Sequence, residues 1–103
     1  RVKVRLLAIL RKHDGATLPV SIVELSGSGL AFTSEFEVVA IGERVSLSCT
    51  LNLKFSAYPI TVSGTVRQVK AVRSKKNYRF GIELMGLTDE QKLIIQASIY
   101  EHL

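Results

Sequence analysis

The strongest constraint on the fold is an alternation of apolar and polar residues near the start of the chain. Between Val2 and Leu10 every second residue is apolar, whereas Lys3, Arg5 and Arg11 fall on the opposite parity. Successive side chains of a β-strand point to opposite faces, so this period of two predicts a half-buried strand over residues 2–11. Asp14-Gly15 then supplies the residue types of a tight turn.

The same reasoning predicts five more strands, separated by turn residues. They cover residues 18–25, 30–33, 45–53, 58–72 and 78–84. In the second strand we expect Val20, Ile22 and Glu24 to share one face. The period changes after Leu87, where Thr88-Asp89-Glu90-Gln91 fits a capping box at the start of a helix. Apolar residues then recur at helical spacing and predict a stripe that packs on the sheet, made of Leu93, Ile94, Ala97 and Tyr100.

Six short strands and a final helix predict a mainly β fold, a six-stranded antiparallel β-barrel with a C-terminal α-helix. A chain of 103 residues has room for one core, so residues 1–103 are expected to form a single domain. Because the chain begins with Arg1, we expect it to be a fragment of a longer protein. A core role is expected for Tyr100 and Leu103, with docking on a neighbouring domain or a second copy as the alternative.

Composition narrows the classes of function. Fourteen Lys and Arg against nine Asp and Glu leave a net charge of +5, which favours anionic partners. Two histidines and Cys49 cannot supply the four ligands of a structural zinc site, and His13 and His102 occupy a turn and the chain end, where a supported catalytic base is not expected. The sequence therefore predicts no enzyme, no metal and no cofactor. A single cysteine, and apolar runs no longer than Leu6–Leu10, favour a cytoplasmic domain that does not insert into a membrane.

Two short segments have the residue types of a ligand site. Glu24-Leu25-Ser26-Gly27-Ser28-Gly29 joins two predicted strands, and a carboxylate, a hydroxyl and exposed amides can together bind the edge of a base. Arg1 and Arg5 offer planar guanidinium donors for phosphate. Taken singly, the first segment also fits a plain hairpin turn and the second a solvated face.

In this order and spacing the segments resemble the PilZ domain, a bacterial receptor module for cyclic di-GMP. Arg1 and Arg5 match its R-x-x-x-R pair, and Glu24, Ser26 and Gly29 match its (D/N)-x-S-x-x-G motif. The segment 78–88 is also similar to the end of such domains. Glu24 departs from the family's Asp or Asn. The arginines allow two registers, because many relatives have the same apolar alternation directly after the second arginine. In that register Arg1 is the second arginine, its partner lies upstream, and Arg5 is an ordinary outward strand residue.

The resemblance implies a ligand, a site and a role. Cyclic di-GMP, as an intercalated dimer, would bind Arg1, Arg5, Glu24, Ser26 and Gly29, with arginine on phosphate and Glu24 on a guanine edge. Ordering of the arginine arm would then transmit the second-messenger level to a neighbouring domain or partner protein, in regulation of motility or exopolysaccharide.

Two alternatives remain from the sequence. One is a divergent PilZ-like module that contacts proteins and binds no nucleotide, which the Glu24 substitution favours. The other is a barrel that binds single-stranded nucleic acid, although no DNA or RNA partner is expected. Its candidate surface is a basic strip beside Tyr78, made of Lys70, Arg73, Lys75, Lys76 and Arg79.

Overall fold

Six strands and one C-terminal α-helix make up the chain in the computed structural model, which describes residues 1–103. The strands are β1 (Val2–Lys12), β2 (Thr17–Leu25), β3 (Gly29–Ser34), β4 (Arg44–Leu53), β5 (Ser56–Val72) and β6 (Asn77–Met85). A short 3₁₀ turn, η1 (Arg73–Lys75), lies between β5 and β6, and the helix α1 covers Asp89–Glu101. All six predicted strands are present, each slightly longer than predicted.

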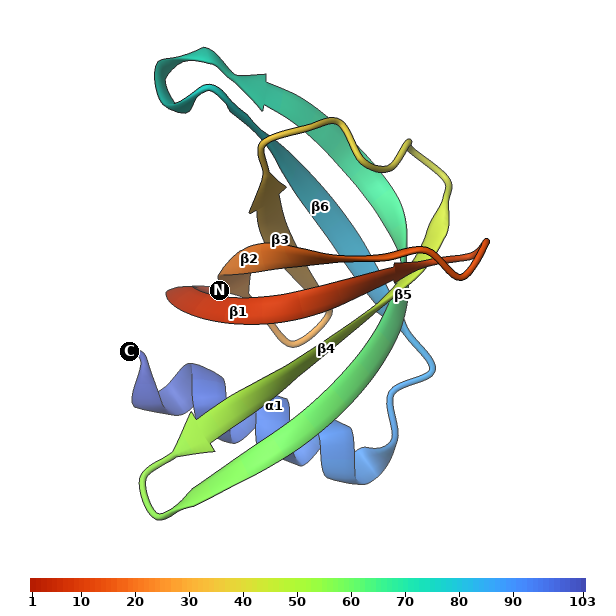
Figure 1. The fold of residues 1–103 in the computed structure, drawn as a ribbon. Coiled ribbons are helices and arrows are strands. Elements are labelled where there is room, and N and C mark those ends of the chain that lie inside the picture. The colour runs from red at the N-terminus through yellow and green to blue at the C-terminus, as the bar shows by residue number, and fades with distance from the viewer.

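The strands close into an antiparallel barrel in the order β1-β2-β3-β6-β5-β4 (Figure 1). Closure depends on the pairing of β1 with β4, where Ile9 lies opposite Ser48 and Lys12 opposite Val45. β3 pairs with β6 and not with β4, so the segment between β3 and β4 crosses one end of the barrel. The predicted six-stranded antiparallel barrel with a C-terminal helix is confirmed.

The barrel interior holds the alternate apolar residues of every strand. Leu10, Ile22 and Leu47 are almost completely buried. Phe32 of β3 stacks on Phe80 of β6, with ring centroids 4.8 Å apart. Burying a side chain of this size contributes about 1.5–3 kcal/mol, so these inward positions hold the strands in register.

Glu24 does not share a face with Val20 and Ile22, and that prediction is wrong. The pairing of β2 with β3 shifts between Ile22 and Glu24, which inserts one extra residue into β2. Such a bulge reverses the alternation beyond it. Glu24 therefore pairs with Ala31, and Leu25 takes the buried position.

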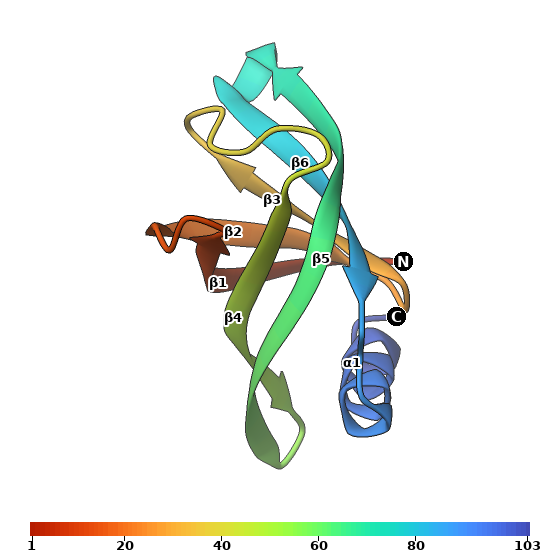
Figure 2. The same ribbon diagram turned by 90° about the vertical axis from the view of Figure 1, so that its right-hand side faces the viewer.

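The helix starts as predicted, but the face that packs against the barrel is rotated from the predicted one. The Thr88 hydroxyl accepts from the Gln91 amide at 3.1 Å, and the Gln91 side chain accepts from the Thr88 amide at 3.1 Å, which completes the capping box. α1 packs against β4 at one end of the barrel (Figure 2). Its buried residues are Ile95, Ser98 and Ile99.

The predicted helical stripe is confirmed only in part, because Ile94 packs against the core but Leu93 and Tyr100 do not, and the predicted core role of Tyr100 and Leu103 is wrong. Leu93 and Tyr100 are 72% and 70% exposed, and Leu103 is 88% exposed. The buried face is rotated toward Ile95 and Ile99, because these two join the barrel core. Because α1 carries apolar residues on both faces, the shape of the barrel end decides which face is buried.

The two ends of the chain lie on the same side of the barrel in both views (Figures 1 and 2). Arg1 therefore lies near the end of α1 as well as near the β2–β3 turn. None of the helices has the length and apolar character that crossing a membrane requires.

Candidate ligand-binding site

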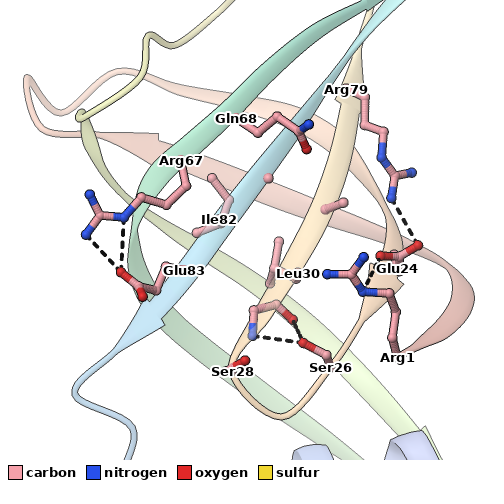
Figure 3. A pocket seen from close by; sticks show the side chains of 13 residues that line it. Arg1, Glu24, Ser26, Ser28, Leu30, Arg67, Gln68, Arg79, Ile82 and Glu83 are labelled. Carbon is pink, nitrogen blue, oxygen red and sulfur yellow. Dashed lines mark hydrogen bonds and ion pairs between the residues drawn. The ribbon is translucent and has the colours of Figure 1, made fainter.

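A pocket of about 310 Å³ lies on the outer surface of the barrel, where β2, β3, β6 and β5 run side by side (Figure 3). Its lining is mostly polar and combines backbone with charged side chains. The lining residues are Arg1, Glu24, Ser26, Ser28, Gly29, Leu30, Ala31, Arg67, Gln68, Arg79, Gly81, Ile82 and Glu83.

Small residues form the floor of this pocket. Ala31 of β3 lies directly opposite Gly81 of β6, so the outer face of the sheet is flat at this pair. At Gly29 the two strands approach so closely that a Cβ would lie 2.7 Å from the Ile82 carbonyl oxygen. Only glycine fits such a backbone approach, and the result is a shallow hollow open to a planar ligand.

The β2–β3 turn forms the lower rim and is held by its own hydrogen bonds. The Ser26 hydroxyl donates to the Gly29 carbonyl oxygen at 3.0 Å and accepts from the Gly29 amide at 3.1 Å. The Ser28 carbonyl oxygen accepts from the Leu84 amide at 2.9 Å, which ties the turn to β6. The turn is therefore fixed before any ligand arrives.

Glu24 lies between two arginines at one side of the pocket (Figure 3). Its Oε1 is 2.9 Å from Arg1 Nε, and its Oε2 is 3.0 Å from an Arg79 guanidinium nitrogen. On the opposite side, Arg67 of β5 donates from Nε and a terminal nitrogen to Glu83 Oε1, at 3.0 and 2.8 Å. Three guanidinium groups thus surround the hollow, and such groups bind phosphate through paired N–H donors.

The structure brings four of the five sequence-predicted site residues together and leaves one apart. Arg1, Glu24, Ser26 and Gly29 all line the pocket. Arg5 is exposed on β1 within a register shift between Lys3 and Leu6, and it lines a separate groove.

Sequence reasoning missed the half of the pocket that β5 and β6 supply. Arg79, Gly81 and Glu83 alternate with the buried Phe80 and Ile82, so their outward direction could have been inferred. Their place beside the Glu24 turn could not, because it depends on the pairing of β3 with β6. Arg67 and Gln68 lie at a second bulge, after Val66, which no sequence signal marks.

The predicted basic strip starts at the pocket and continues along the β5–β6 hairpin. Arg79 is ion-paired to Glu24 in the pocket, Lys70 lies directly opposite Arg79 in the pairing of β5 with β6, and Arg73 is exposed on η1. Tyr78 packs against the core beside Phe80, with ring centroids 6.4 Å apart. The strip therefore lacks the free aromatic platform on which single-stranded nucleic acid binders stack bases.

Comparisons with known proteins agree with the fold described above. The family model for the PilZ domain matches residues 1–101. No curated protein matches the chain in sequence. Among solved structures, the inhibitor of motility MotI (DgrA) from Bacillus subtilis superposes with a TM-score of 0.82 at 15% identity, over 96% of this chain and 47% of MotI. The chain thus spans about half the length of MotI. The PilZ domain of YcgR from Escherichia coli, solved with c-di-GMP, superposes with a TM-score of 0.75 at 10% identity, over 98% of this chain and 86% of that one.

Proposed function

The chain belongs to the PilZ domain family, and we propose that it is a receptor domain for cyclic di-GMP that acts on a neighbouring domain or partner protein. PilZ domains are regulatory binding modules, and the YcgR domain of the same fold was solved with this nucleotide. The observation that carries the proposal is the convergence of Arg1 with the Glu24–Gly29 turn on one outer pocket. The regulated process, motility or exopolysaccharide synthesis, stays a prediction, as does the cytoplasmic location.

The pocket offers a partner for a phosphate and a surface for the face of a guanine. Arg1 would bind a phosphate, since its side chain is 75% exposed and borders the hollow. The flat floor at Ala31 and Gly81 would accept the face of a guanine. Ser26 would act mainly through the turn it holds, because both of its hydrogen bonds go to Gly29.

Of the two arginine registers, we favour the one in which Arg1 is the second arginine of the motif. Arg1 borders the Glu24–Gly29 turn, and Arg5 lines a groove with Leu7 and Cys49 instead. Arg1 precedes β1 and Arg5 lies within it, and two side chains that line separate hollows do not converge on one ligand.

Titration calorimetry with cyclic di-GMP tests the function, on residues 1–103 and on the full natural chain. We expect saturable binding that Arg1→Ala weakens about tenfold to a hundredfold, the value of one charge-assisted contact. The matched control is Arg11→Ala, which removes an exposed arginine of β1 that lies outside the pocket. Arg5→Ala decides the register and should bind like Arg11→Ala.

Absence of binding in the full natural chain would refute the receptor proposal. The nucleotide-free protein-contact module would then be the better account. A loss with Arg5→Ala equal to that with Arg1→Ala would instead keep the receptor and reverse the register.

A further inference from the structure

Every arginine that lines the pocket is already paired with a carboxylate of the same pocket. Glu24 holds Arg1 with one oxygen and Arg79 with the other, at 2.9 and 3.0 Å. Glu83 holds Arg67 at 2.8 Å. The site thus carries three positive and two negative side chains. An incoming anion meets guanidinium N–H donors that are already bonded to carboxylates.

The two sides of the pocket differ in their exposure to water. The Glu24 and Arg79 side chains are 18% and 33% exposed, whereas Glu83 and Arg67 are 55% and 59% exposed. Solvent and salt screen an exposed pair strongly and a partly buried pair much less. Glu24 is therefore the carboxylate that competes most strongly for the pocket's guanidinium groups.

Glu24 is also poorly placed for the role that the PilZ resemblance implies for it. A carboxylate that accepts from a guanine edge needs its oxygens directed at the ligand. Here Oε1 and Oε2 each face a guanidinium, one from Arg1 just before β1 and one from Arg79 on β6. The longer side chain of Glu, compared with Asp or Asn, lets one residue bridge both arginines.

We propose that Glu24 is an internal counterion which the phosphate of the ligand displaces, and that Arg79 binds phosphate together with Arg1. This inference rests on the proposed function and adds how the pocket controls which anions bind to it. Binding is then an exchange, in which the guanidinium groups pass from the carboxylate to phosphate oxygens and the carboxylate turns to water. A small monoanion would have to displace Glu24 and would gain only one arginine contact in return. A ligand with two phosphates engages both arginines at once, so the exchange favours ligands with two phosphates over small monoanions.

Two glutamate variants separate exchange from a general change of charge. Glu24→Gln and Glu83→Gln each remove one negative charge from the pocket, but only the first frees Arg1 and Arg79. For cyclic di-GMP we expect Glu24→Gln to raise the affinity about tenfold and Glu83→Gln about twofold, because the exposed Glu83 pair is screened more strongly and competes less. A lower affinity in Glu24→Gln would overturn the exchange, because it would show Glu24 binding the ligand directly. Equal increases would overturn it too.

Inorganic pyrophosphate gives a readout that does not require the nucleotide to bind. Its titration is followed by NMR through the side-chain Nε–H signals of Arg1 and Arg79. We expect both signals to shift at lower pyrophosphate concentration in Glu24→Gln than in the wild type or Glu83→Gln. If this holds while cyclic di-GMP does not bind, the exchange stands and the proposed function fails. If pyrophosphate shifts neither signal in any variant, the exchange is refuted even where cyclic di-GMP binds.

Arg79 has its own test. Arg79→Gln should weaken cyclic di-GMP about tenfold, whereas Arg73→Gln, on η1 and outside the pocket, should bind like the wild type. Matching melting temperatures would exclude a folding effect. Wild-type affinity in Arg79→Gln would refute the assignment of Arg79 to phosphate.

Discussion

Replacing Gly29 with alanine tests how closely β3 and β6 approach beneath the pocket. The added Cβ would lie 2.7 Å from the Ile82 carbonyl oxygen, whereas ordinary contacts begin at 3.4 Å. The strands must then separate by the difference, about 0.7 Å, because a backbone oxygen inside a ladder cannot swing aside. Overpacking of this kind costs about 1–3 kcal/mol of unfolding free energy.

Gly27 supplies a matched control two residues away in the same turn. A Cβ at Gly27 meets nothing within 4 Å, so Gly27→Ala should be neutral or slightly stabilising. Urea unfolding of both variants gives the comparison, with unchanged m-values expected. For Gly29→Ala we also expect a melting temperature lower by roughly 4–8 °C per kcal/mol lost. Equal stability of the two variants would refute the close approach.

Three further predictions concern single side chains, one in the same turn and two elsewhere in the molecule. Ser26→Ala removes both side-chain hydrogen bonds to Gly29 and should lower the unfolding free energy by about 1–2 kcal/mol in urea. Thr88→Ala removes the hydrogen bond that caps the helix at Gln91 and should lower the unfolding free energy by about 1 kcal/mol in the same assay. An unchanged unfolding free energy would mean that the cap does not stabilise the folded chain. Burial raises the pKa of the Cys49 thiol, so iodoacetamide should alkylate the folded chain more slowly at pH 8 than the urea-unfolded chain. The unfolded state then loses this proton first, so stability should fall as pH rises past the ordinary thiol pKa of roughly 8.5; equal alkylation rates would contradict the shift.

The sequence was sufficient for the barrel because the alternation of each strand is a local property. Val2 to Leu10 and Val45 to Leu53 show their inward faces without knowledge of any neighbour. The exceptions are Glu24 and the part of β5 beyond Val66, where one extra residue in the strand reverses the parity. A bulge is set by the packing of adjacent strands, and nothing in the residue types there marks it.

The site was predictable only in part. Ser26 and Gly29 belong to one turn, so their proximity results from adjacency in sequence. Arg79 and Arg67 enter the pocket from β6 and β5, through strand pairings that depend on closure of the whole barrel. The prediction of the buried face of α1 failed for a similar reason. Leu93 and Ile95 are both apolar, and only the shape of the barrel end decides which of them is buried.

The central claim, that cyclic di-GMP binds the outer pocket, is tested most directly by NMR titration of the amide signals. We predict that the nucleotide shifts the amides of Ser28, Gly29 and Gly81, which line the hollow from the β2–β3 turn, β3 and β6. The amides of Cys49 and Thr50, in the separate groove that Arg5 lines, should stay in place. Shifts confined to that groove, or no shift at saturating nucleotide in the full natural chain, would contradict the account.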